Sequence, residues 1–201
     1  TVFSNKLSFT ITSIGFSNSI IYRNRAKIYD DIYVSGNLGD SYLGLLILQK
    51  KIKLKNPLAK YFTSQYFAPN LKLKLSHQLK KFANSSIDIS DGLLSDLGKL
   101  INKQKLSYKL NLNSIPISNN LKKVLKIKNL SKANFISKGD DYQILFTASK
   151  KKSELIKKIS KKLGVKITKI GKIQKKTLKS SIIDHNNTVI TLKNKGYFHK
   201  F

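Results

Sequence analysis

The chain has 201 residues, of which 40% are hydrophobic and 9% aromatic, so it carries enough apolar side chains for a folded core and is not expected to be disordered. It contains no cysteine, which excludes disulfides and thiolate chemistry, and its longest apolar run is far shorter than the roughly 20 residues of a membrane helix. The formal net charge is +29, with 39 basic against 10 acidic residues, so binding to a polyanion has to be considered first.

The kind of basic residue argues against specific nucleic-acid recognition. Arg23 and Arg25 are the only arginines, whereas base edges and phosphates are contacted best by the forked arginine side chain. The lysine excess is typical of a solvated surface, although a basic nucleic-acid binder remains an alternative. His77, His185 and His199 are too widely spaced to predict a zinc site. With no recognisable signal peptide or membrane helix, we expect a soluble, cytoplasmic protein.

The first half of the chain predicts strands alternating with helices. Residues 7–14 alternate between apolar and polar types and predict a strand. Residues 32–34 predict a short buried strand, and the glycine-rich turn at 35–40 leads into a helix expected over 41–51. The spacing of leucines and a phenylalanine predicts a further helix over 71–82.

Between these two helices, Pro57 and Pro69 predict an irregular region. In the second half, residues 153–163 predict a helix that Gly164 ends. A turn at 185–187 is expected to join the last two strands, because asparagine tolerates positive φ. Five strands are expected in this half, at 108–112, 142–147, 166–173, 180–184 and 188–192. Strands and helices intermix without a strict βαβ period, so we predict an α+β fold with a mixed or antiparallel sheet.

Two carboxylates, Asp88 and Asp91, flank Ser90 where a short strand is expected to end and a helix to begin at about Gly92. Magnesium prefers hard oxygen ligands and is usually held by one or two carboxylates together with substrate phosphates. The first amides of a helix and a serine hydroxyl can hold the phosphate. The pattern therefore fits a magnesium–phosphate site, while the same residue types also suit a simple helix cap.

A second acidic pair, Asp140 and Asp141, follows Lys138 and Gly139 and precedes an expected strand. Adjacent carboxylates on an extended chain face opposite ways. One of them can therefore reach a site while the other caps or turns the loop, and a turn alone would also explain both.

These local patterns together resemble one family. Residues 87–97, IDISDGLLSDL, resemble the "IDISDGL..DL" segment of thiamine-monophosphate kinases, and residues 139–147, GDDYQILFT, resemble their "GG(D/E)DYELLFT". Three more segments match in order, namely DIYVSGNLGDS at 31–41, IGKI at 170–173 and KGYFH at 195–199. Families that share the architecture, such as aminoimidazole-ribonucleotide synthetase, selenide water dikinase and a hydrogenase maturation factor, carry different glycine-rich segments where this chain has its "IDISDGL" stretch.

The resemblance implies a fold, a reaction and a division into domains. The fold would be the C-terminal domain of the aminoimidazole-ribonucleotide synthetase-like architecture, with a mixed or antiparallel sheet packed with helices. Residues 1–25 would be the last strand and exit of an N-terminal ATP-binding domain, and residues 26–201 the C-terminal domain. The reaction would transfer the γ-phosphoryl group of ATP to thiamine monophosphate, giving ADP and thiamine diphosphate, with Mg²⁺ as cofactor.

By the same resemblance, six side chains form the site. Two carboxylates would bind magnesium, two polar side chains the nucleotide, and an acid and an aromatic ring the thiamine moiety. In that order they are Asp88 and Asp91, Arg23 and Ser90, and Asp140 and Tyr197. The other interpretation of Tyr197 is an aromatic side chain that only covers the core.

The chain departs from the family pattern at Lys138, Gln143 and Arg25, and it lacks the acidic "GDD" and "GGDT" segments of the family's first domain. The resemblance therefore implies a chain that is inactive alone and whose partners are that first domain and, in the full-length enzyme, a second copy. A non-catalytic module that binds thiamine phosphates or another protein remains an alternative.

Overall fold

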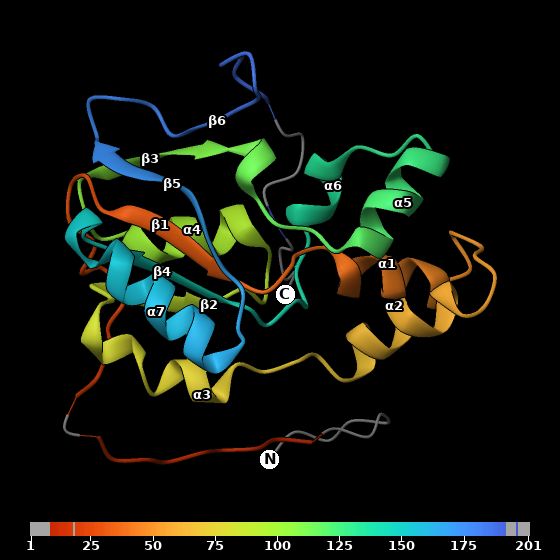
Figure 1. Ribbon diagram of the computed structural model, residues 1–201, viewed down its shortest axis with the longest axis horizontal. Coiled ribbons are helices and arrows are strands. Elements are labelled where there is room, and N and C mark those ends of the chain that lie inside the picture. Colours follow the sequence, from red (N-terminus) through yellow and green to blue (C-terminus); the bar gives the residue numbers. More distant parts are fainter. Residues whose placement is uncertain (1–8, 18, 192–195, 197–201) are drawn as a thin grey trace, which may run out of the picture.

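The computed structural model describes residues 9–17, 19–191 and 196. The described residues form one six-stranded sheet with the order β2-β4-β1-β5-β3-β6 (Figure 1). Neighbouring strands run antiparallel except β3 and β6, which are parallel. The strands are β1 Asp31–Ser35, β2 Ser85–Asp88, β3 Leu106–Asn111, β4 Ile144–Ala148, β5 Ile167–Lys175 and β6 Ser181–Ile183.

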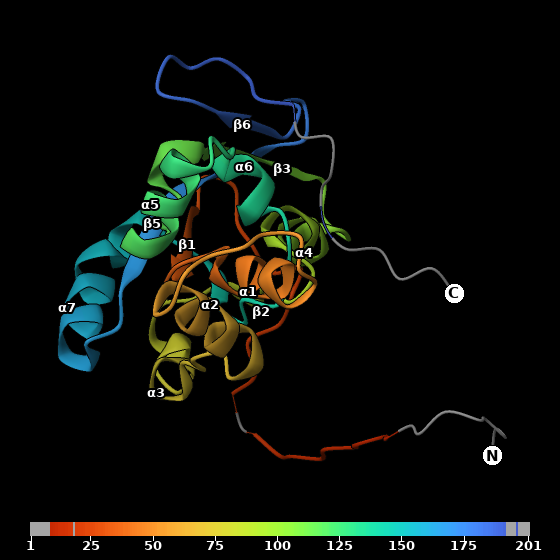
Figure 2. The same cartoon turned by 90° about the vertical axis from the view of Figure 1, so that its right-hand side faces the viewer.

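Helices cover both faces of this sheet, so the predicted α+β class with a mixed sheet is confirmed (Figures 1 and 2). The α-helices of the described residues are α1 Asp40–Leu48, α2 Leu58–Phe67, α3 Leu73–Ser76, α4 Leu93–Ile101, α5 Asn119–Ile127, α6 Lys132–Ile136 and α7 Ser153–Leu163. None of them is long and apolar enough to cross a membrane.

Alternating side chains on β1 separate two hydrophobic cores. Ile32 and Val34 contribute to the larger core, which α4 also enters, whereas Tyr33 points to the smaller one beneath α7. There the Tyr33 ring stacks on Phe146 with centroids 5.2 Å apart. In Figure 2, α4 and α7 lie on opposite sides of the sheet. The candidate site begins at the C-terminal end of β2, which is an edge strand of this sheet.

Elements with a strong local signal match their predictions. The predicted strand at 32–34 is β1, which is buried at every position because strands pair with it on both sides. The predicted helix at 153–163 is α7, and Gly164 ends it in the left-handed conformation with φ 61°.

Other predictions are wrong. Residues 9–14 form no strand, and Figure 1 shows residues 9–17 as an extended trace that runs below α3, away from the sheet. The predicted helix at 71–82 is broken into α3 and a 3-10 turn at Leu79–Lys81, and the region predicted to be irregular contains α2. The predicted strand at 188–192 is reduced, among its described residues, to one bridge between Val189 and Ile183.

Candidate functional site

The loop that follows β2 is held by the carboxylate of Asp96, which is fully buried on α4. One of its oxygens, Oδ2, accepts hydrogen bonds from the backbone N–H groups of Ser90, Asp91 and Gly92, at 3.0, 2.9 and 3.1 Å. Three donors on one oxygen fix the path of this loop. No role was predicted for Asp96. Its position four residues after a glycine at a helix start was the available signal.

Lys99 joins the carboxylates of Asp91 and Asp96. Its Nζ donates to Asp96 Oδ1 at 2.9 Å and forms an ion pair with Asp91 Oδ2. Burial lowers the pKa of Lys99, but its contacts with Asp91 and Asp96 outweigh burial, so the net change is upward. Lys99 was not predicted either, because it lies outside the segment 87–97 that resembles the family.

A second loop, which precedes β4, is joined to the first by backbone hydrogen bonds. The N–H of Ile89 donates to the carbonyl of Gln143, and the N–H of Tyr142 donates to the carbonyl of Ile89, each at 2.9 Å. The N–H of Asp140 donates to the carbonyl of Ser90, also at 2.9 Å. The two acidic segments singled out in the sequence, 50 residues apart, therefore form one unit.

Glycines allow the two loops to approach this closely. A Cβ at Gly139 would collide with the carbonyl of Ser90, and a Cβ at Gly92 would collide with the carbonyl of Ser137. Gly92 also has φ 114°, a conformation that side chains with a Cβ rarely adopt. Both glycines are thus required by the contact between the loops.

Three of the predicted site carboxylates lie close together around Tyr142. Burial raises the pKa of the Tyr142 hydroxyl first, and the charges of Asp140, Asp88 and Asp91 raise it further. Burial also raises the pKa of Asp140, followed by repulsion from Asp91. The structure therefore brings the two predicted magnesium ligands next to the predicted thiamine-binding acid.

The donor set suits magnesium shared with phosphates. No three His, Cys, Asp or Glu side chains of the described residues gather into a site that would hold a metal alone. The structure offers two carboxylates, exposed Asp88 at the end of β2 and partly exposed Asp91 in the loop after it. Two is a number that magnesium usually takes from a protein when phosphates complete its shell. Asp88 and Asp91 therefore fit this ion.

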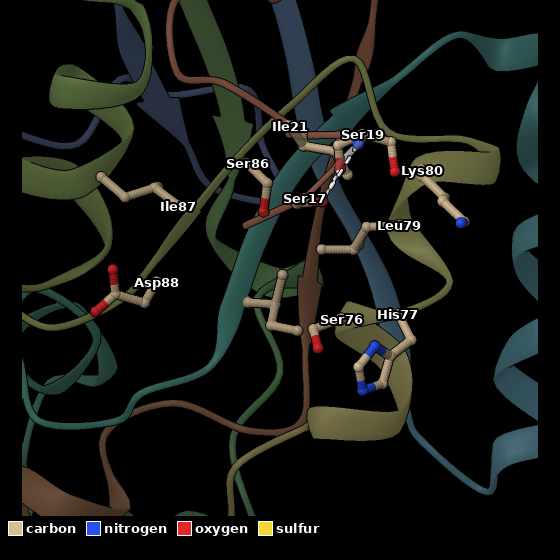
Figure 3. A pocket seen from close by; sticks show the side chains of 11 residues that line it. Ser17, Ser19, Ile21, Ser76, His77, Leu79, Lys80, Ser86, Ile87 and Asp88 are labelled. Atoms are coloured by element: carbon tan, nitrogen blue, oxygen red, sulfur yellow. Dashed lines mark hydrogen bonds between the residues drawn. The ribbon is translucent and has the colours of Figure 1, made fainter. Parts of the chain in front are cut away.

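The predicted nucleotide-binding side chains face the same space. Arg23 and Ser90 line a cavity of about 450 Å³ together with Asp88 and Lys99. A neighbouring cavity of about 470 Å³ also reaches Asp88. Figure 3 shows this second cavity, with Asp88 on one side and His77 on the other. Asp88 thus lies where the two cavities meet.

Asp141 points away from the site, as one of two adjacent carboxylates was expected to do. Its side chain is buried, and both oxygens accept from the N–H of Gly39, at 3.0 and 2.9 Å, at the start of α1. Burial raises the pKa of Asp141 well above its usual range, while the hydrogen bond from Gly39 acts in the opposite direction. Asp141 therefore anchors α1 to the loop that carries Asp140.

The departures from the family pattern are accommodated. Lys138 has no positive φ, and its Nζ lies 5.8 Å from the centre of the Tyr42 ring. The Gln143 side chain accepts from the Ser35 hydroxyl at 2.9 Å and helps to hold the loop. Arg25 is exposed.

Tyr197 lies outside the described residues. Its neighbour Gly196 is described, and a Cβ added there would come within 2.9 Å of the carbonyl oxygen of Asp91. The chain thus returns to the candidate site at the position just before Tyr197.

No protein-family model matches the chain. The curated thiamine-monophosphate kinase of Buchnera aphidicola subsp. Schizaphis graminum (strain Sg) is 37% identical over 200 residues, covering 98% of this chain and 61% of that protein. The crystal structure of thiamine-monophosphate kinase from Stenotrophomonas maltophilia K279a superposes with a TM-score of 0.72 at 27% identity, covering 82% of this chain and 52% of that one. The structure described as AaThiL complexed with AMPPCP and TMP gives a TM-score of 0.71 at 25% identity, covering 89% and 54%.

The chain spans about three fifths of the length of the curated relatives that it matches first. Similarity extends along nearly all of this chain in sequence, and the fold predicted from the resemblance, that of the aminoimidazole-ribonucleotide synthetase-like proteins, is confirmed. The resemblance read from five short segments is therefore confirmed: in sequence and in fold, this chain is similar to about three fifths of a thiamine-monophosphate kinase.

Proposed function

We propose that this chain is the C-terminal part of a thiamine-monophosphate kinase, which transfers the γ-phosphoryl group of ATP to thiamine monophosphate. The observation that carries the proposal is the joining of two loops, which gathers Asp88, Asp91 and Asp140 around one point. The names of the relatives support the reaction. The similar structure described as a complex with AMPPCP and TMP supports a nucleotide and thiamine monophosphate as the ligands.

In this proposal Asp88 and Asp91 bind magnesium, and Arg23 and Ser90 donate hydrogen bonds to the nucleotide. Magnesium, when bound, supplies positive charge that neutralises the phosphate oxygens during transfer. The guanidinium of Arg23 and the hydroxyl of Ser90 line one cavity with Asp88, so all three can act on the same polyphosphate.

The acceptor is proposed to lie against Asp140 and Tyr197. Thiamine carries a positive charge, which a carboxylate attracts and an aromatic face stabilises. Phosphoryl transfer between two phosphates requires alignment and charge neutralisation more than a covalent partner. A site of carboxylates and hydrogen-bond donors, such as the one formed here, meets this requirement.

We also propose that residues 1–25 belong to an N-terminal ATP-binding domain and residues 26–201 to the C-terminal domain. Supporting this division, Phe9, Ile11, Ile14 and Phe16 each expose more than four fifths of their surface, at 83, 89, 85 and 100%. Exposed apolar side chains gathered in one segment are typical of a surface that another part of the protein covers. The partners of this chain would be the rest of the first domain and, in the assembled enzyme, a second copy of the enzyme.

The test is substitution of the magnesium ligands in an enzyme assembled from a relative's first domain and this chain. Asp88→Asn or Asp91→Asn should reduce turnover by about 100-fold or more, because a neutral amide holds Mg²⁺ poorly. Glu154→Gln, at an exposed position of α7, is the matched control and should leave turnover unchanged. Full turnover and unchanged magnesium dependence in Asp88→Asn and Asp91→Asn would disprove the assignment.

A further inference from the structure

Lys99 has no role in the reaction proposed above. It lies on α4, one turn after Asp96, and its ammonium group reaches two carboxylates at once. Asp96 is 1% exposed at its side chain and already holds three backbone N–H groups through its other oxygen. Asp96 is therefore committed to the loop, and its pair with Lys99 is the more enclosed of the two.

Asp91 is in a different position. Its side chain is 22% exposed, and within the described part of the chain Lys99 is its one ion-pair partner. The oxygen that contacts Lys99 belongs to a carboxylate that the proposed function assigns to magnesium. An ammonium and a magnesium ion therefore compete for the same group, and each repels the other when both are near.

We propose that Lys99 is a positioning residue that holds Asp91 in place before the metal arrives and weakens the affinity of Asp91 for magnesium. The inference rests on the proposed function, because it takes Asp91 to be a metal ligand. When magnesium takes Asp91, the ammonium stays bound to Asp96. It then remains on the wall of the cavity that Lys99 shares with Arg23 and Ser90.

The pairing also explains how the loop keeps its shape without the metal. The N–H of Asp140 donates to the carbonyl of Ser90, which places Asp140 beside Asp91, and the two carboxylates repel each other. Lys99 provides the positive charge that offsets this repulsion at Asp91. The ion pair with Lys99 therefore preorganises Asp91 for the metal, but the metal has to displace the ammonium group of Lys99 from Asp91 to bind.

The experiment measures Mn²⁺ as a probe for the magnesium site, by electron paramagnetic resonance of the free ion, with the whole chain and with AMPPCP present to supply the phosphate oxygens. Lys99→Met should lower the dissociation constant by about tenfold, because the positive charge paired with the Asp91 carboxylate is removed. Lys99→Gln should do the same if the methionine variant does not fold. Lys99→Arg keeps the charge and should bind Mn²⁺ about as the unsubstituted chain does. Lys103→Met, an exposed lysine four residues further on, is the matched control.

Thermal unfolding gives a second, independent measurement. Without metal, Lys99→Met should unfold at a lower temperature, and added Mg²⁺ should raise that temperature more than it does for the unsubstituted chain. Unchanged or weaker Mn²⁺ binding in both folded charge-removing variants would overturn the inference.

Asp91→Asn separates this inference from the proposed function. If Asp91→Asn weakens Mn²⁺ binding but removal of the Lys99 charge does not strengthen it, only the role of Lys99 is wrong. If Asp91→Asn leaves Mn²⁺ binding unchanged, the magnesium assignment itself is wrong and the inference falls with it.

Discussion

Asp140 and Asp141 are neighbours in the chain that act in different parts of the molecule. Asp141 is buried and accepts from Gly39, whereas Asp140 lies beside Asp91 at the site. Because Asp141 is hydrogen-bonded to the start of α1, it holds in place the loop that carries Asp140. A substitution at Asp140 should therefore report on ligand binding, and one at Asp141 on folding.

At the residue scale, we predict that Asp140→Ala and Tyr197→Ala each weaken the binding of thiamine monophosphate by about tenfold. Each removes a group that attracts the positive charge of the ligand. Isothermal titration calorimetry on the assembled enzyme measures this effect, with Glu154→Ala as the control. Unchanged affinity in the double variant, shown to be folded by circular dichroism, would exclude both residues from the site.

Some site residues could be predicted from the sequence and others could not. Asp88, Ser90 and Asp91 stand out because carboxylates and a hydroxyl gather within four residues at the end of a strand. The roles of Asp96 and Lys99 depend on which atoms face the loop once α4 has packed. No local pattern distinguishes such a carboxylate from one on a solvated helix face.

At the element scale, the two loops depend on the absence of a side chain at Gly139. We predict that Gly139→Ala lowers the free energy of unfolding by at least about 2 kcal/mol, because the added methyl group collides with the Ser90 carbonyl. It should also abolish Mn²⁺ binding. Gly98→Ala, in the middle of α4 where the added atom meets nothing within 4 Å, is the control and should stabilise by about 0.5–1 kcal/mol.

Urea unfolding followed by circular dichroism measures both variants. Equal stability of Gly139→Ala and the unsubstituted chain would contradict the close approach of the loops. A loss of stability in Gly98→Ala of the same size as in Gly139→Ala would show that neither effect comes from this contact.

The elements that could not be predicted lack a local signal. Helix α7 has an amphipathic pattern and a glycine at its end, and both can be read from the sequence. Helix α2 follows a proline and has no side-chain cap. It packs on α1 where Gly44 meets the carbonyl of Phe62, a contact between residues 18 apart in the chain. Tertiary packing rather than local pattern explains why this segment is helical.

At the scale of the whole molecule, we predict that this chain alone does not make thiamine diphosphate. Transfer requires ATP, magnesium and the acceptor phosphate to be held in line. The described residues supply only two proposed metal ligands, Asp88 and Asp91. Adding a relative's first domain should restore turnover. A coupled ADP-release assay with thiamine monophosphate measures both conditions.

Rapid turnover by the chain alone would overturn the proposed dependence on a first domain. Inactivity in both conditions, with thiamine monophosphate still bound, would instead favour the non-catalytic binding module. Salt-sensitive binding of DNA duplexes, without any response to thiamine monophosphate, would favour the basic nucleic-acid binder.

The contact between the two loops is made by main-chain atoms, and this determines how substitutions affect the site. Ile89, Ser90, Asp140, Tyr142 and Gln143 contribute amides or carbonyls that any residue except proline possesses. The hydrogen bonds between the loops therefore do not involve these side chains, although Asp140 and Tyr142 have φ of 67° and 48°, which few side chains favour. A substitution of the Asp140 side chain should therefore change what the site binds while the two loops stay joined by their main chains.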